Sequence, residues 1–161
     1  MKAISFDDPF AKKGTKSIDD DLFIQSNHFN YLTMVHDNID FSFNSLIVKE
    51  LKKKISSYKS QDKLKSRYDN EQFITYHELL IMLLKSKLKC YYCNDDLLLM
   101  YKNKNETKQW SLERFNNNKG HYSKNCCISC LKCNLQRRTD NHEYFKMGKK
   151  LSVIKKDKLD N

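Results

Sequence analysis

The sequence predicts an α+β fold, in which a helical N-terminal region precedes a small hairpin module closed by cysteines. Three observations lead to this prediction. Two Cys-x-x-Cys pairs flank residues 94–129, part of that interval alternates polar and apolar residues around a turn, and apolar residues upstream recur at helical spacing. The chain of 161 residues has room for one compact domain, or for a small module with an appendage.

The two cysteine pairs, Cys90 with Cys93 and Cys130 with Cys133, have the spacing of zinc knuckles. Each pair can place two thiolates on one metal, and Zn²⁺ favours a closed tetrahedron of four such ligands. Two disulfides or a redox dithiol are the alternatives. Disulfides are typical of small secreted chains, but no signal-peptide apolar core is visible here, and a redox pair would lie beside a βαβ pattern that is absent. We therefore expect one structural Zn²⁺.

The interval between the pairs has the pattern of a β-hairpin. Residues 110–115 alternate in polarity and are predicted to form a strand, and residues 116–120 have the composition of a turn. Residues 126–129 are predicted to form the returning strand, whose two cysteines point to opposite faces and lie outside the zinc shell. The segment after the last knuckle is polar, basic and free of helix breakers, so a helix is expected there.

This succession of knuckle, hairpin, knuckle and helix resembles the HNH, or ββα-metal, endonucleases. It is most similar to their zinc-stapled branch, which includes phage recombination endonucleases and related viral proteins. The resemblance covers about residues 72–146 and rests on residues 111–121, on Asn125 and on the motif Cys130-x-x-Cys133-Asn134. It implies a ββα-metal fold and metal-dependent hydrolysis of DNA phosphodiester bonds, with a catalytic Mg²⁺ or Mn²⁺ besides the structural zinc.

The resemblance also assigns roles to residues of the hairpin. The family's metal-binding carboxylate and asparagine correspond to Glu113 and Asn134, and the asparagine that braces the hairpin corresponds to Asn125. The family's general base, a histidine directly after the carboxylate, is replaced by Arg114, which cannot deprotonate water at any working pH. His121 is the nearby imidazole that could act instead, while Arg114 could clamp a phosphate oxygen. Alternatively, His121 is an ordinary loop residue and no protein base is present.

Basic side chains accumulate after the hairpin. The chain has a formal net charge of +10, and most of the excess lies between residues 124 and 156. Solvated surface is the simpler explanation of such a run, but beside a zinc-stapled hairpin it favours nucleic acid, whose phosphates release counterions to bound cations. The expected partner is duplex or branched DNA, with RNA as a further candidate, and the oligomeric state, a homodimer included, stays open. The candidate contacts are Lys124, Lys132, Arg137, Arg138, Lys146, Lys149 and Lys150.

The organisation expected along the chain has four parts. Residues 1–20 form a mobile arm, residues 21–70 a partly helical accessory region, residues 71–146 the zinc-stapled module and residues 147–161 a basic tail. Within the second part, residues 22–43 hold many aromatics without clean periodicity. We expect short strands or irregular structure packed on the module, the alternative being a platform on which nucleic-acid bases stack.

Two helices are expected before the first knuckle. From residue 44 on, an apolar stripe with helical spacing runs as far as Tyr58. Residues 56–70 are polar and are expected to be a loop or a frayed helix end, and the lysines at 52–54 are expected to be either a solvated face or a DNA contact. Thr75 and Glu78 form a capping-box pattern that begins a buried helix over about residues 76–86.

Two classes of function follow from these patterns. The first is a metal-dependent DNA endonuclease with a single-metal HNH-type site. The second is a zinc-stapled nucleic-acid-binding protein, such as a regulatory or packaging factor, that has lost the general base. No apolar run approaches the roughly 20 residues that cross a bilayer, so no membrane association is expected. The expected location is intracellular, in the cytoplasm or nucleus of a host.

Overall fold

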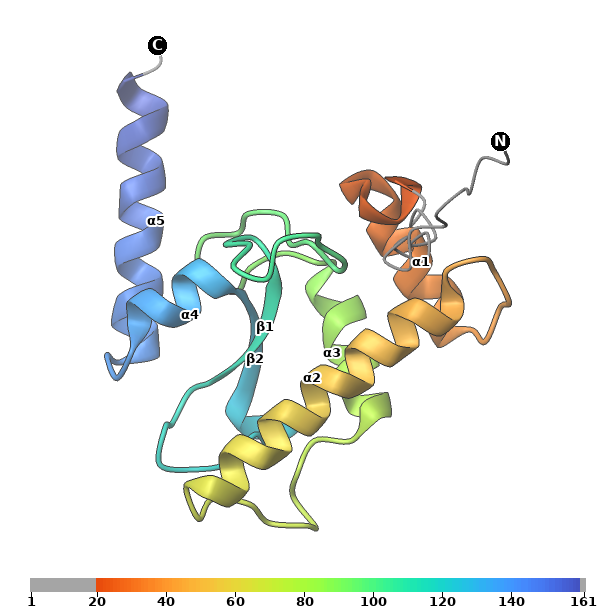
Figure 1. Ribbon diagram of the computed structural model, residues 1–161. Coiled ribbons are helices and arrows are strands. Elements are labelled where there is room, and N and C mark those ends of the chain that lie inside the picture. The colour runs from red at the N-terminus through yellow and green to blue at the C-terminus, as the bar shows by residue number, and fades with distance from the viewer. Residues whose placement is uncertain (1–19, 160–161) are drawn as a thin grey trace, which may run out of the picture.

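The computed structural model describes residues 20–159, with side chains described up to residue 151. The mobile arm expected at the N-terminus lies outside the described residues, except for its last residue. In chain order the elements are η1 (Asp20–Phe23), α1 (Gln25–His36), α2 (Asn44–Leu64), α3 (Tyr76–Ser86), β1 (Trp110–Arg114), η2 (Ser123–Asn125), β2 (Cys126–Cys130), α4 (Leu131–Arg137) and α5 (His142–Leu159). The fold is mixed α and β, as predicted, and the two strands lie between α2 and α3 on one side and α4 and α5 on the other (Figure 1).

The two strands pair as an antiparallel hairpin at the position that the sequence predicts. Trp110 lies opposite Cys130 at one end of the ladder, and Arg114 lies opposite Cys126 at the other. Because successive residues of a strand point to opposite faces, the side chains of β1 divide into two sets. One set is Trp110, Leu112 and Arg114, and its face is contacted by Lys54 and Asp62 of α2. The other set is Ser111 and Glu113, and its face is contacted by residues of α4.

The outer edge of β1 is covered by α2. The backbone N–H of Leu112 donates to the Tyr58 hydroxyl at 3.0 Å, and the Lys54 ammonium donates to the Trp110 carbonyl. The same ammonium lies 4.2 Å from the centroid of the Trp110 ring, and burial lowers the pKa of Lys54 to about 7. The two side chains of α2 therefore satisfy backbone groups that an additional strand would otherwise pair.

The region of residues 22–43 is largely helical, which corrects the expectation of short strands or irregular structure. The helix α1 buries His28 together with two apolar residues at helical spacing. Because a polar residue holds one position of the buried stripe, the periodicity is hidden in the sequence. Tyr31 stacks on Phe41 at 5.5 Å between ring centroids, and both rings pack against the hydrophobic core. The aromatics of this region thus contribute to core packing.

The helix α2 is longer than the sequence predicts. It continues to Leu64, so the loop expected from residue 56 begins only after that point. Its buried stripe extends past Tyr58 to Asp62, whose side chain is fully buried. Of the three lysines at 52–54, the first two are exposed, whereas the third lies half-buried on the indole described above.

The helix α3 begins at the predicted capping box. The Thr75 hydroxyl accepts from the Glu78 backbone N–H at 3.2 Å, and the Glu78 carboxylate accepts from the Thr75 backbone N–H at 2.8 Å. Leu79 and Leu83 are fully buried, as expected for a helix that is apolar on most sides. The helix ends at Ser86, its C-cap Lys87 adopts a left-handed backbone conformation, and the chain then enters the first knuckle.

Two helices follow the hairpin. The helix α4 begins at Leu131, so Cys133 and Asn134 lie within it and not before it. The helix α5 runs without interruption through residue 146, where the module was expected to give way to the basic tail. Among the described residues, no helix is both long enough and apolar enough to cross a membrane.

Candidate metal centre and hairpin site

The four knuckle cysteines come together in one cluster, as the sequence predicts. The sulfur atoms of Cys90, Cys93, Cys130 and Cys133 all lie within 4.8 Å of one another, and the Cys93 and Cys130 sulfurs are 4.0 Å apart. Four thiolates at about 2.3 Å from a tetrahedral Zn²⁺ would lie about 3.8 Å apart, so the cluster fits this ion. All six cysteines of the chain are free, which removes the disulfide alternative in this structure.

Backbone amides support the sulfur atoms of the cluster. The N–H groups of Cys130 and Cys133 donate to the sulfurs of Cys90 and Cys130, each at 3.3 Å. The knuckle itself is closed by the Cys90 N–H, which donates to the Asp95 carbonyl at 2.9 Å. Such amide donors favour the thiolate form that binds metal, because they stabilise its negative charge. The cluster could therefore hold a thiophilic ion, and four thiolates would leave that ion no open ligand position.

The other two cysteines lie outside the cluster. Cys126 and Cys127 are buried in β2, opposite Arg114 and Glu113 in the strand ladder, so they point to opposite faces of the hairpin. Burial raises the pKa of both thiols well above the ordinary value. This shift favours the thiol in both, whereas the thiolate is the nucleophilic form.

Glu113, the expected catalytic metal ligand, is buried in an ion pair with Arg137. The Arg137 guanidinium donates from Nε to Oε1 at 2.9 Å and from Nη2 to Oε1 at 2.5 Å. From the other side, the Tyr92 hydroxyl donates to Oε2 at 2.6 Å. The Arg137 side chain is only 1% exposed, so the expectation that it lies on a basic strip open to phosphate is wrong.

The second expected ligand, Asn134, lies on the same side of the hairpin. Its amide donates to the Ser111 hydroxyl at 3.1 Å, and Ser111 and Glu113 share one face of β1. A divalent cation at this place would meet the Arg137 guanidinium, which already binds the carboxylate. As arranged, the two residues therefore do not fit Mg²⁺ or Mn²⁺.

His121 lies elsewhere, in the cluster that joins the hairpin loop to α2. Its Nδ1 is 2.8 Å from one oxygen of Asp62, and its backbone N–H donates to the other oxygen at 2.6 Å. The ring packs on Tyr58 with 4.6 Å between centroids. Burial lowers the pKa of His121, although the neighbouring Asp62 opposes this effect.

Arg114 also belongs to the His121 cluster. Its guanidinium lies 3.7 Å from the buried Asp62 carboxylate and donates to the Lys119 carbonyl at 3.1 Å. Since Arg114 and Glu113 are adjacent in β1, their side chains take opposite faces of the strand. The structure thus places His121 and Arg114 together but on the other side of the hairpin from Glu113 and Asn134.

Asn125 ties the hairpin loop together. Its amide nitrogen donates to the carbonyls of Asn116 and Gly120 at 3.1 and 3.0 Å, and its amide oxygen accepts from the Asn116 N–H at 3.0 Å. A Cβ at Gly120 would lie 2.5 Å from the Arg67 carbonyl oxygen and 2.9 Å from an Asp62 oxygen. Glycine is therefore required where the loop meets α2.

Sequence reasoning missed two residues of these clusters, Asp62 and Tyr92, and misplaced Arg137. A signal for Asp62 exists, because it follows Tyr58 by four residues and so continues the buried stripe of α2. A signal for Arg137 is weaker, since it lies one helical turn after Cys133 in a run that otherwise looks solvated. Nothing in the sequence separates Tyr92 from the neighbouring Tyr91.

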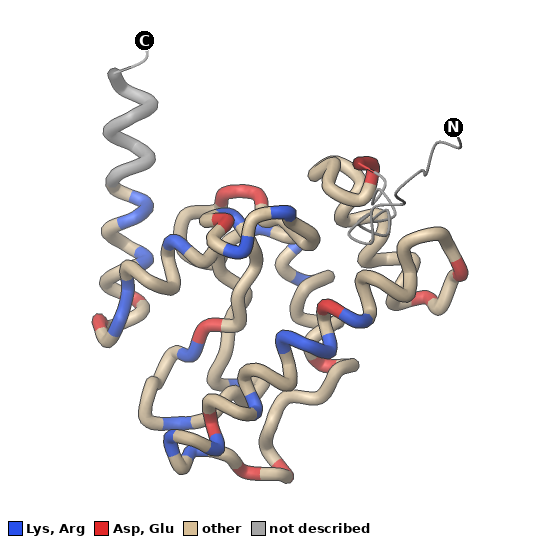
Figure 2. The backbone as a smooth tube through the Cα atoms, viewed as in Figure 1, with Lys and Arg blue, Asp and Glu red and all other residues tan. Residues whose placement is uncertain are grey.

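The remaining basic candidates are more open to solvent. The side chains of Lys124, Lys132, Arg138 and Lys150 are exposed, and those of Lys146 and Lys149 are half-buried. Basic residues recur along α2, around the hairpin and on α4 and α5 (Figure 2). In contrast to Arg137, these side chains reach the solvent.

The fold and the site define a small α+β protein with a four-cysteine cluster that could hold a metal ion such as zinc. The chain matches no family model, no curated protein and no solved structure with which it was compared. The relation to the HNH endonucleases is therefore a resemblance of sequence pattern.

Proposed function

We propose that this protein binds nucleic acid, with a structural Zn²⁺ in the four-cysteine cluster that fixes the hairpin against α4. The observation that carries the proposal is the set of exposed cations around this cluster and hairpin, on a chain with a net charge of +10. Each cation that meets a phosphate releases a counterion, which is the main source of affinity for such surfaces.

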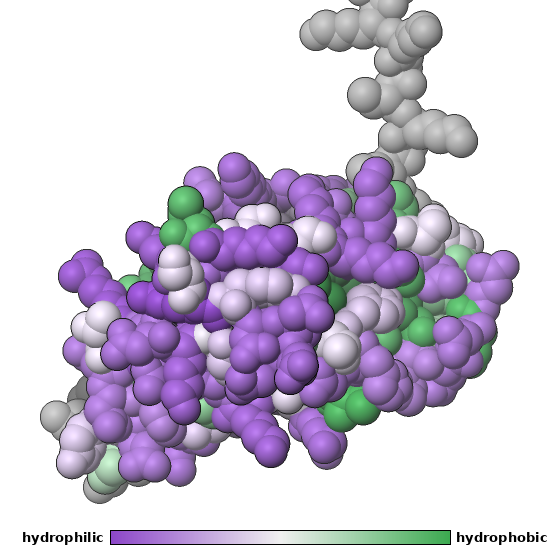
Figure 3. Space-filling model, turned by 90° about the horizontal axis from the view of Figure 1, so that it is seen from below, coloured by the Kyte–Doolittle hydropathy of each residue, from purple (hydrophilic) through white to green (hydrophobic). Residues whose placement is uncertain are grey.

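The character of the surface supports a charged partner. The face seen from below in Figure 3 is largely hydrophilic, with only scattered hydrophobic areas. The zinc supplies rigidity to this arrangement, because a small chain with a modest core gains folding energy from a bound metal.

The proposal is tested by measuring duplex DNA affinity as a function of salt concentration. We expect log K to fall linearly with log salt, with a slope of about −0.9 for each phosphate contact. Each of the single substitutions Lys124→Gln, Lys132→Gln and Arg138→Gln should make the slope of log K against log salt less steep by about 1. Lys49→Gln, on α2, makes the same charge change away from the hairpin and serves as the control. A flat salt response would contradict the proposal.

A second candidate function, metal-dependent cleavage, is favoured by the shared position of Glu113 and Asn134 on the α4 side of the hairpin. It requires Arg137 to release the carboxylate. Incubation of supercoiled plasmid and branched DNA with Mg²⁺ or Mn²⁺ decides between the two. Cleavage that Asn134→Ala abolishes, with zinc content and DNA affinity unchanged, would establish a nuclease. Its absence on every substrate leaves nucleic-acid binding alone.

A further inference from the structure

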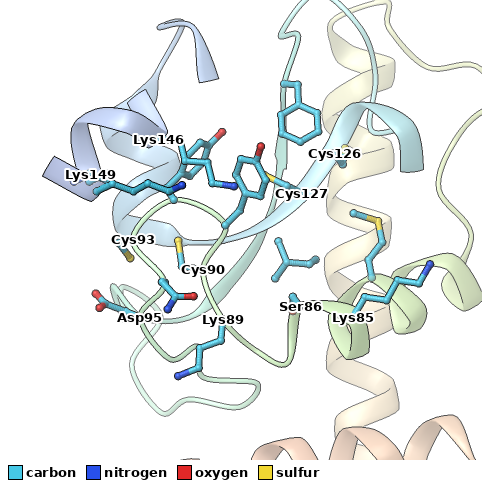
Figure 4. A pocket seen from close by; sticks show the side chains of 17 residues that line it. Lys85, Ser86, Lys89, Cys90, Cys93, Asp95, Cys126, Cys127, Lys146 and Lys149 are labelled. Carbon is cyan, nitrogen blue, oxygen red and sulfur yellow. The ribbon is translucent and has the colours of Figure 1, made fainter. Parts of the chain in front are cut away.

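A basic groove lies beside the first knuckle, on the side where α5 passes over it. Its volume is about 1040 Å³, and its walls are the end of α3, the knuckle residues 89–95 and the first turns of α5. Part of β2 and the ring of Phe115 complete the lining. Figure 4 shows Lys146 and Lys149 reaching over the knuckle from α5, with Lys85 on α3 and Lys89 on the loop that enters the knuckle.

The charge of the groove is strongly positive. Five lysines line it from opposite walls, and Asp95 is the one carboxylate among the described lining residues. Lys89 forms an ion pair with Asp96, and no ion pair of the other four is found in the described part of the chain. Cations on both walls suit a polyanion that passes between them, because each phosphate can then meet a cation on either side.

Aromatic rings lie in the same groove. Tyr91 and Phe115 are half-buried and meet edge to face, with 5.4 Å between centroids. The Lys146 ammonium lies over the Tyr91 ring, 3.5 Å from its centroid. A ring that accepts a cation on its face also accepts a flat nucleobase there, and base–aromatic stacking tolerates any base.

We propose that this groove binds a single-stranded segment of nucleic acid, with its phosphates between the lysines of α5 and Lys85 of α3 and a base stacked on Tyr91. The proposal rests on the proposed nucleic-acid binding and assigns it a strand preference and a site. A duplex keeps its bases stacked on one another, so only a single strand can use both the cations and the ring. On binding, the Lys146 ammonium leaves the Tyr91 face for a phosphate, and the base takes its place.

The test compares a fluorescein-labelled oligothymidylate with a duplex of the same length, by anisotropy with the zinc-loaded full chain. Tyr91→Leu should weaken oligothymidylate binding roughly 5- to 150-fold, the usual worth of one stacked base, and duplex binding much less. Lys85→Ala with Lys150→Ala removes two exposed cations of the groove and should also weaken the single strand more than the duplex. Lys49→Ala with Lys104→Ala makes the same charge change outside the groove and is the control.

The possible outcomes distinguish the groove proposal from the proposed nucleic-acid binding. If the duplex binds but the groove variants and the control affect oligothymidylate equally, the groove proposal falls and nucleic-acid binding stands. If neither ligand binds, both fall. If polyglutamate displaces oligothymidylate at equal charge concentration, and Tyr91→Leu has no effect, the groove takes acidic protein segments instead. Equal zinc content in all variants shows that a loss comes from the groove and not from unfolding.

Discussion

At the residue scale, the Glu113 carboxylate is held from two sides, by the Tyr92 hydroxyl and by the Arg137 guanidinium. The guanidinium also donates to the Arg114 carbonyl at 2.6 Å and to the Asp140 carbonyl at 2.6 Å. Although burial opposes its charge, the hydrogen bonds to Glu113 raise the pKa of Arg137. One side chain thus joins the first knuckle, through Tyr92 and Glu113, to β1 and to the end of α4.

Removing one partner of this pair should be far more costly than removing both. Arg137→Ala leaves the Glu113 charge buried without its counter-ion, and we expect a loss of about 3–5 kcal/mol in the free energy of unfolding. The double variant Glu113→Gln, Arg137→Met should lose clearly less than the sum of the single changes. Urea unfolding of the zinc-loaded protein measures both. The exposed Arg138→Ala is the control, with an expected change within about 0.5 kcal/mol.

The residues that could be predicted from the sequence are those whose role follows from local spacing. The knuckle cysteines, the Thr75–Glu78 cap and the turn of the hairpin all act within a few residues of the chain. The pairing of Glu113 with Arg137 depends on how α4 packs on β1, which local spacing does not determine. For the same reason the metal-ligand role assigned to Glu113 by resemblance could not anticipate that a guanidinium would bind its carboxylate.

At the element scale, the hairpin depends on packing at both ends and along one edge. The cysteine cluster fixes the end of β2 and the start of α4 to the first knuckle, and the contact between Asp62 and His121 fixes the loop to α2. The helical form of residues 22–43 was missed because its buried face includes a histidine. The strands were found because their alternation and turn composition are visible without knowledge of the tertiary structure.

The cluster gives a direct prediction at this scale. We expect one Zn²⁺ per chain, and none in a Cys130→Ala, Cys133→Ala double variant, because two ligands cannot hold the ion tightly. Elemental analysis of protein purified without chelator measures the content. Since α4 and the hairpin meet at the cluster, metal removal should also reduce thermal stability. Cys126→Ala, outside the cluster, should keep its zinc, and zinc retained by the double variant would contradict the assignment.

At the scale of the whole molecule, two buried histidines connect the N-terminal helices to the rest of the chain. His28 of α1 lies 3.1 Å from the Leu22 carbonyl through Nε2, and its Nδ1 accepts from the Leu99 N–H at 3.1 Å. His121 makes the corresponding link between the hairpin loop and α2. The His28 ring uses one nitrogen as a donor and the other as an acceptor, so it is neutral, and its protonation would break the hydrogen bond from the Leu99 N–H.

These histidines predict how stability changes with pH. Burial lowers the pKa of both His28 and His121 below the ordinary 6.5, so the unfolded chain binds protons that the folded chain does not. The free energy of unfolding should therefore be highest above pH about 6.5 and fall as the pH drops from there toward the folded-state values. Urea unfolding with excess zinc at several pH values measures this. His121→Gln should reduce the slope of the free energy of unfolding against pH, and the exposed His77→Gln should not. A free energy of unfolding that rises on acidification would contradict the assignment.

Because α2 covers the edge of β1, the hairpin segment depends on a helix that lies outside it. Residues 72–146, which carry the resemblance to a known nuclease module, do not include Tyr58 or Lys54. Transplanted alone, that segment would present the Leu112 N–H and the Trp110 carbonyl without partners, on a two-stranded ribbon of marginal stability. Such a bare edge invites pairing with a second copy. A graft of this four-cysteine hairpin into another scaffold therefore has to carry α2, or an equivalent helix, along with it.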